Sequence, residues 1–314
     1  IYKTYGDMIM KILVSGLLNI ETTVSVRGFP INYYPIDYPF FGINSSVSGV
    51  GFNIAKSLTT LGDDVRLISL LGKDDEGERI LKQLHKDGIK VDNIRQNIKD
   101  TPCSIVLFDS TGKRQIYCDL KDIQEQTINP EDISNLDDCD IAVLCNINFN
   151  RELIKKAKQL GVLIATDVHV LNDINDEYNR DFMENADILF LSDERLPCSA
   201  EDFIWQIENH YHNKIIVIGM GAKGAMLLDS EKNEVSMISS FNNGKIVNTI
   251  GAGDALFSSF LHYYIKGYNA KESLQRAVIF AGIKIGYNGA SIGFCTEQDI
   301  DKIIKTSESG NHDK

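Results

Sequence analysis

Residues 248–254 bring several chemically useful residue types into one short stretch. They read Asn-Thr-Ile-Gly-Ala-Gly-Asp and precede an amphipathic run, residues 255–267, that predicts a helix. Small residues at a helix start leave backbone N–H groups uncovered, and these groups and the helix dipole attract anions. Asp254 would lie in the first turn, where its carboxylate could accept a proton from a hydroxyl attacking a phosphoryl group. A plain helix cap is the structural alternative.

The overall charge limits the partners of such a site. The chain has 314 residues and a formal net charge of -12, with 43% hydrophobic and 24% charged residues. This composition is typical of a globular protein with a sizeable core. The acidic field argues against nucleic acid and against an anionic membrane surface as partners. Nucleotides remain compatible, because backbone N–H groups bind phosphate whatever the net charge.

The cysteines and the chain start indicate a cytoplasmic protein. No C-x-x-C or other zinc spacing occurs, so we expect no metal site in the chain and interpret the cysteines as buried free thiols in a reducing compartment. No run reaches the ~20 apolar residues of a membrane span, and residues 1–7 do not resemble a signal peptide. The six cysteines are Cys103, Cys118, Cys139, Cys145, Cys198 and Cys295.

Short apolar runs alternate with amphipathic runs along most of the chain. This order predicts one α/β domain, residues 8–306, with a central, mostly parallel sheet. Two segments, about 22–48 and 101–120, break the alternation and predict a small separate sheet, either an edge hairpin or a lid that excludes water from a site. Predicted strands cover residues 12–16, 65–71, 141–145, 162–166, 188–191 and 215–218, and predicted helices cover 53–61, 76–86 and 151–160.

Residues 247–257 resemble the C-terminal signature of the ribokinase-like (PfkB) carbohydrate kinases, D-T-x-G-A-G-D-x-F. Residues 49–62 are similar to the N-terminal G-G-x-x-x-N-x-A signature of that family, 71–77 to its G-x-D-x-x-G motif, and 219–224 to its nucleotide loop. The resemblance covers almost the whole chain. It implies a three-layer α/β/α ribokinase-like domain with a small β lid, and transfer of the γ-phosphate of Mg-ATP to a hydroxyl of a small sugar.

The resemblance also implies roles for single residues. Asp254 would be the catalytic base, and Gly251, Ala252 and Gly253 would form the anion hole. The implied substrate residues are Asn19, Glu21, Gly49 and Asn53, and the implied nucleotide residues are Ser192, Gly219, Gly221, Gly224 and Thr249.

Four departures from the family pattern qualify these roles. Asn248 replaces an Asp near the monovalent-cation site of relatives, which leaves potassium activation open. Ser48 replaces the first Gly of the G-G pair, and Glu21 is one methylene longer than the usual Asp. The N-x-x-E motif becomes Ser-Asp-Glu-Arg at 192–195, so Asp193 or Glu194 is a candidate for organising the waters of Mg²⁺.

Several alternatives stay open on the sequence. The acceptor could be a nucleoside, since the aromatic residues of the lid segment suit stacking on a base; these are Tyr33, Tyr34, Phe40 and Phe41. The chain could instead be a non-catalytic sugar- or nucleotide-binding regulator, although the intact Gly-Ala-Gly-Asp at 251–254 argues against this. Exposed apolar lid strands predict a homodimer that pairs through the lid.

Polar residues after predicted strands are weaker candidates. Asp167 and His169 follow one strand, and Asn146 and Asn148 follow another; the carboxyl ends of parallel strands line ligand crevices. The two histidines at 210 and 212 are interpreted as part of a solvated helix face rather than as a metal pair. Residues 219–224 formally match a dinucleotide fingerprint, but a strand-like run follows them where a helix would be required.

Overall fold

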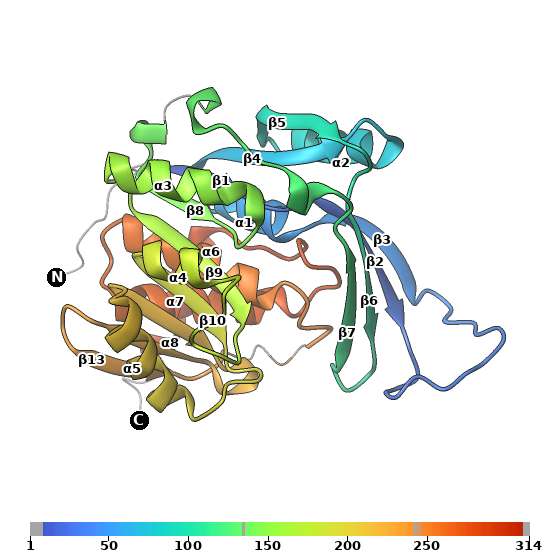
Figure 1. The fold of residues 1–314 in the computed structure, drawn as a ribbon. Helices are drawn as coiled ribbons and strands as arrows, with labels where there is room; N and C mark the ends of the chain where they lie inside the picture. The colour runs from blue at the N-terminus through green and yellow to red at the C-terminus, as the bar shows by residue number, and fades with distance from the viewer. Residues whose placement is uncertain (1–8, 134–135, 242–243, 245, 310–314) are drawn as a thin grey trace.

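The computed structural model describes residues 9–133, 136–241, 244 and 246–309. A nine-stranded sheet forms the centre of the molecule in the order β13-β12-β11-β10-β9-β8-β1-β4-β5 (Figure 1). Neighbouring strands from β5 to β11 are parallel, while β12 and β13 continue the sheet as antiparallel strands. The strands are β1 (Lys11–Ser15), β4 (Asp64–Gly72), β5 (Lys90–Ile98), β8 (Ile141–Leu144), β9 (Ile164–Val170), β10 (Ile188–Ser192), β11 (Ile215–Gly219), β12 (Ala225–Asp229) and β13 (Glu234–Ile238).

Helices cover both faces of this sheet. Successive residues of a strand point to opposite faces, so each strand contributes side chains to the core on either side. In β1, Ile12 and Val14 pack into the core shared with helices α1, α2, α6 and α7, whereas Leu13 packs into the core shared with α3, α4 and α5. This arrangement confirms the predicted three-layer α/β/α class. The helices are α1 (Val50–Leu61), α2 (Asp75–Lys86), α3 (Arg151–Leu160), α4 (Arg180–Asn185), α5 (Ala200–Tyr211), α6 (Ala252–Ile265), α7 (Ala270–Lys284) and α8 (Glu297–Ser309).

A second, four-stranded sheet extends to one side of the main body (Figure 1). Its order is β3-β2-β6-β7; β2 pairs with β3 and β6 with β7 in antiparallel fashion, while β2 and β6 are parallel. Every residue of β7 is exposed. The strands are β2 (Asn19–Ser25), β3 (Ile43–Ser48), β6 (Cys103–Phe108) and β7 (Arg114–Asp119). The two segments that break the sequence alternation therefore supply most of this sheet, which we call the side sheet.

The structure differs from some predictions made from the sequence. All six cysteines are free, but only Cys145 is buried; Cys118 and Cys198 are exposed, so the expectation of buried thiols is wrong for them. The predicted domain start, residue 8, lies outside the described residues. No helix in the described part of the chain is long and apolar enough to cross a membrane.

Asn150 fastens the ends of two central strands that lead toward the loops of the candidate site. Its Nδ2 atom donates to the carbonyl oxygens of Ser15, at 2.9 Å, and Cys145, at 2.8 Å, and the side chain is completely buried. It thus holds the ends of β1 and β8 together by satisfying two buried acceptors.

We predict that Asn150→Ala lowers the free energy of unfolding by about 3 kcal/mol, since the buried carbonyls lose their donor. Urea denaturation followed by circular dichroism measures this. Asn209→Ala is the matched control, because Asn209 Nδ2 donates to a single carbonyl on an exposed helix surface. Equal midpoints for the two variants would contradict the assignment.

Candidate active site

The first turns of α1 and α6 meet at a buried hydrogen bond. Asn53 Nδ2 donates to Asp254 Oδ2 at 2.7 Å, and both side chains are buried. Helix α6 begins directly after Gly251, so the Asp254 carboxylate lies at the positive end of the helix dipole. The N–H of Ala252 donates to the Thr249 carbonyl oxygen at 3.2 Å. Of the three predicted anion-hole donors, Ala252 is therefore already engaged within the loop.

Two glycines allow backbone segments to approach closely here. Gly251 has a φ of 74°, and a Cβ atom on it would collide with the carbonyl oxygen of Ala290. Gly49, before α1, has a φ of 103°, and a Cβ atom there would collide with the carbonyl oxygen of Leu17. Both positions lie in the left-handed region, which glycine adopts without steric cost. The chain directly after β1 therefore leaves no room for a side chain at position 49.

Strand β2 contributes two further predicted substrate residues. Asn19 and Glu21 point to the same side of the strand because they are two residues apart. Asn19 Nδ2 donates to Ser104 Oγ at 3.0 Å, and Ser48 Oγ donates to Glu21 Oε2 at 3.3 Å. The remaining oxygens, Asn19 Oδ1 and Glu21 Oε1, are buried without a hydrogen-bond partner among the described residues, and so is Asn53 Oδ1. Such unsatisfied acceptors are costly unless a ligand supplies donors.

The site holds charges of both signs. Burial raises the pKa of Asp254, whereas His169 and Lys284 favour its ionised form. Burial raises the pKa of Glu21 as well. At the end of β9, His169 Nδ1 lies 3.4 Å from Asp167 Oδ2; against the desolvation of the ring, Asp167 raises the pKa of His169 to about 9. The carboxylates of the site thus face two cationic side chains.

The predicted nucleotide residues lie at neighbouring strand ends. Ser192 and Gly219 are paired in register at the ends of β10 and β11. A Cβ atom on Gly219 would lie 3.8 Å from the side chain of Leu256, which places this strand end beside helix α6, the helix that follows the 248–254 loop. Residues 221–223 form a short 3₁₀ turn, and Gly224 has a φ of 110° with the Ile238 carbonyl oxygen where a Cβ atom would be. Gly224 is therefore required by the connection to β12.

The side sheet touches the 248–254 loop directly. Arg114 Nη1 of β7 donates to Thr249 Oγ1 at 3.1 Å and to the Thr249 carbonyl oxygen at 3.3 Å. Val106 of β6 packs with Ile250 and Ala290 in a small buried cluster. Sequence reasoning missed Arg114, and nothing in its local pattern marks it. It also missed Lys284, for which a lysine between apolar neighbours at 283 and 285 was the available signal.

The other sequence candidates lie apart or are otherwise engaged. Asn148 Nδ2 donates to the Gln124 carbonyl oxygen at 2.9 Å, and Asn146 Nδ2 donates to Asn179 Oδ1 at 3.0 Å. The aromatic side chains of the β2–β3 loop project into solvent; Tyr33 is 87% exposed and Phe40 is 83% exposed. The described residues contain no group of three or more His, Cys, Asp or Glu side chains placed to hold a metal.

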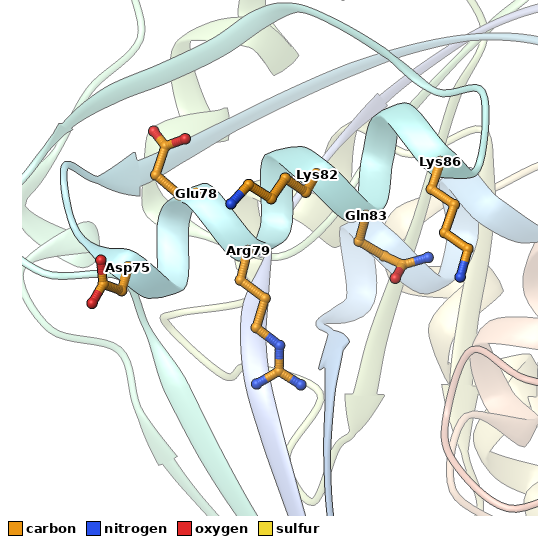
Figure 2. Close-up of a pocket in the computed structure, with 6 residues that line it drawn as sticks. All are labelled: Asp75, Glu78, Arg79, Lys82, Gln83 and Lys86. Carbon is orange, nitrogen blue, oxygen red and sulfur yellow. The ribbon is translucent and has the colours of Figure 1, made fainter.

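A hollow on the outer face of α2 is separate from these residues (Figure 2). All six of its side chains come from this one helix: Asp75, Glu78, Arg79, Lys82, Gln83 and Lys86. Arg79 has a structural role, since it donates to Ser45 Oγ at 2.9 Å and to the Ser45 carbonyl oxygen at 2.7 Å, and so joins α2 to the side sheet. We interpret the hollow as a charged, solvated helix face.

Comparison with known proteins agrees with the family resemblance seen in the sequence. The model of the pfkB family carbohydrate kinases matches residues 11–297. A ribokinase of Dictyostelium discoideum is 22% identical over 326 residues, covering 92% of this chain and 98% of that protein.

Solved structures of similar proteins share the fold. The Arabidopsis thaliana ribokinase complexed with ribose and ATP has a TM-score of 0.77 and 21% identity, covering 95% of this chain and 99% of that one. The Burkholderia thailandensis nucleoside kinase in complex with inosine has a TM-score of 0.78 and 17% identity, with coverage of 94% and 97%. These likenesses confirm the ribokinase-like fold that the sequence predicts.

Because the Asn53 amide favours the ionised form of Asp254, we predict that Asn53→Ala raises the pKa of Asp254 further. Any reaction step that requires the carboxylate would then be lost at a higher pH, and the acid limb of a kcat/KM profile would move upward. Asn185→Ala, on the exposed surface of α4, serves as the control. An acid limb that stays at the wild-type pH would show that this hydrogen bond does not tune Asp254.

Proposed function

This chain belongs to the pfkB family of carbohydrate kinases, and we propose that it transfers the γ-phosphate of Mg-ATP to a hydroxyl of a small sugar with Asp254 as the base. The observation that carries the proposal is the buried Asn53–Asp254 pair at the start of α6. It places a carboxylate beside a helix start, where phosphoryl oxygens are stabilised by N–H donors and the helix dipole. The chain is a phosphotransferase of the sugar-kinase type; the acceptor and the residue roles are the proposed part.

In the proposed reaction, the acceptor hydroxyl lies between Asp254 and the γ-phosphate. Its oxygen attacks phosphorus as the bond to the leaving ADP oxygen breaks, and its proton passes to an Asp254 oxygen. Gly251 and Gly253 direct N–H groups at the transferred phosphoryl group, while Ser192, Gly219, Gly221 and Gly224 line the nucleotide. The raised pKa of Asp254 makes its carboxylate a better proton acceptor than an exposed Asp.

The proposed acceptor is a polyhydroxyl compound. Asn19 Oδ1, Glu21 Oε1 and Asn53 Oδ1 are buried acceptors without donors among the described residues, and sugar hydroxyls can donate to all three. A nucleoside also presents ribose hydroxyls and is the second candidate, in line with the nucleoside kinase that shares the fold. The exposure of the loop aromatics gives this second candidate no stacking surface in the present arrangement.

Mg²⁺ bound with ATP supplies charge neutralisation to the phosphates. Mg²⁺ keeps several waters and binds largely through substrate phosphates, so it needs few ligands from the protein. We propose that Asp193 or Glu194, which follow the end of β10, organise those waters. Unchanged Mg²⁺ dependence in both the Asp193→Ala and Glu194→Ala variants would remove this role.

Assembly and location remain our predictions. The side sheet ends in the exposed strand β7, and Ile116 and Tyr117 on it are 50% and 54% exposed. We expect this surface to pair two copies of the chain in a cytoplasmic homodimer, with no nucleic-acid or membrane partner. Sedimentation velocity tests the pairing, and a monomer at micromolar concentration would contradict it.

We predict that Asp254→Asn lowers kcat by about 10²- to 10⁴-fold, the usual contribution of a general base, with little change in ATP affinity. The same variant should melt at a higher temperature at pH 7. The folded protein holds the Asp254 proton more tightly than the unfolded chain does, so ionised Asp254 costs stability above its unfolded pKa of about 3.9. Turnover near the wild-type value would refute the base assignment.

A panel of sugars and nucleosides, with ADP release as the measurement, tests the acceptor class. We expect turnover with a free sugar. Turnover with nucleosides alone would select the second candidate. ATP binding without turnover on any acceptor would instead favour a non-catalytic sugar- or nucleotide-binding regulator.

A further inference from the structure

Lys284, the last residue of α7, is completely buried. Lysine is among the side chains least often found in this state, because removing an ammonium group from water is costly unless partners replace the water. Burial accordingly lowers the pKa of Lys284 to about 8. The proposed reaction assigns this side chain no step, so its position behind the active-site loop needs its own explanation.

The ammonium group of Lys284 has one protein acceptor of particular interest. Nζ donates to the carbonyl oxygen of Ile250, the residue directly before the three small residues of the loop. The loop is fastened to the end of α7 at a second point, since the N–H of Val247 donates to the Ile285 carbonyl oxygen at 2.8 Å. The end of α7 therefore holds the loop through one donor and one acceptor.

The contact at Ile250 fixes the direction of a neighbouring donor. The Ile250 carbonyl and the Gly251 N–H belong to one planar trans peptide unit, so they point in opposite directions. With the oxygen turned toward Lys284, the Gly251 N–H is turned away from it. Gly251 is one of the two predicted anion-hole donors that remain once Ala252 is engaged within the loop. Lys284 thus controls the orientation of a donor that it does not touch.

Lys284 also balances the charge of the site. Three charged side chains face it from other elements: Asp254 on α6 and Glu21 on β2 favour its charged form, while Arg114 on β7 opposes it. Bound ATP would add further negative charge next to Asp254. A fixed cation behind the loop offsets this accumulation in a medium of low dielectric constant, where charges interact strongly.

The polar group beside Ile250 is neutral. Asn248 Oδ1 accepts a hydrogen bond from the Ile250 N–H at 3.2 Å, and its Nδ2 donates to Asn288 Oδ1 at 2.7 Å. A free monovalent cation prefers oxygen ligands, including carboxylates and backbone carbonyls. Here the side chain at 248 carries no charge, and the Ile250 carbonyl is taken by an ammonium group of the chain itself.

We propose that Lys284 is a positioning residue that acts as a built-in monovalent cation, orienting the 248–254 loop and removing any need for a potassium or ammonium ion there. The proposal rests on the phosphoryl-transfer function proposed above. Lys284 acts through the Ile250 peptide and through its charge, without touching either substrate.

Two variants separate charge from volume. Lys284→Ala removes the charge and leaves space for an ion, whereas Lys284→Met removes the charge and fills most of the space. Lys284→Met avoids the cavity that the Ala variant creates, although removing the cation that faces Asp254 and Glu21 costs some stability. Lys271→Ala is the matched control, because Lys271 lies on the same helix with its side chain 54% exposed.

Steady-state kinetics in a buffer of tetramethylammonium salts gives the first measurement. Wild type and Lys271→Ala should show the same kcat with and without added K⁺ or NH₄⁺. Both Lys284 variants should lose at least about tenfold in kcat. This loss should be smaller than the loss that follows deletion of an oxyanion donor, because the donor is still present in both variants. Added NH₄⁺ or K⁺ should restore part of the loss in Lys284→Ala only.

The acid limb of the kcat/KM profile provides a readout that a merely structural role would not move. Lys284 favours the ionised form of Asp254, so its removal raises the pKa of Asp254. The acid limb of Lys284→Met should therefore move to higher pH than that of wild type.

Thermal melting without substrates keeps this proposal distinct from the proposed function. K⁺ or NH₄⁺ should raise the melting temperature of Lys284→Ala relative to tetramethylammonium at equal ionic strength, and should not do so for wild type. A wild type that transfers no phosphate would defeat the proposed function while this measurement still tests the cation role. Wild-type dependence on K⁺, or Lys284→Ala with unchanged kcat and no cation-specific stabilisation, would overturn the proposal.

Discussion

The hydrogen bond between Asn53 and Asp254 is the contact on which the arrangement of the site depends. It joins the first turns of two helices whose bonded residues are 201 positions apart, and it lies where both helices present their N-terminal ends. Because the amide donates and the carboxylate accepts, the pair fixes the orientation of both groups. The amide oxygen of Asn53, Oδ1, does not contact Asp254 and is one of the buried acceptors without a partner among the described residues.

The charge distribution explains how acidic groups coexist in a buried site. Burial disfavours the ionised forms of Asp254 and Glu21, and the charge of Asp254 further disfavours that of Glu21. Lys284 favours the ionised form of both carboxylates, and His169 favours the ionised form of Asp254. The stability of the folded chain is therefore reduced locally by groups to which the proposed function assigns roles, a common property of active sites. The cost is limited because cationic side chains lie behind and beside the carboxylates.

Much of the fold could be predicted from the sequence, because strands buried on both faces appear as apolar runs and the helices between them have clear periodicity and glycine ends. The edge strand β5 was missed, since its residues are mostly half-exposed and mixed in polarity. Lys284 and Arg114 were missed for another reason. Their importance comes from contacts with residues 250 and 249, respectively 34 and 135 positions away. The apolar neighbours of Lys284 could indicate that it is buried, but local patterns do not identify such distant partners. The comparison with a family identified the loop but not the groups that support it.

Strand β2 belongs to two parts of the molecule at once. Its first residue, Asn19, and then Glu21 present buried acceptors at the site, while the rest of the strand lies in the middle of the side sheet between β3 and β6. Any rigid displacement of that sheet must carry these acceptors with it. Under the proposed function, capture of the acceptor and shielding of the phosphoryl group from water would consequently be one mechanical event. The strand that selects the acceptor in this proposal would then also suppress wasteful hydrolysis of ATP. A substitution on β2 that changes acceptor preference would therefore also change how much ATP is hydrolysed without transfer to the acceptor.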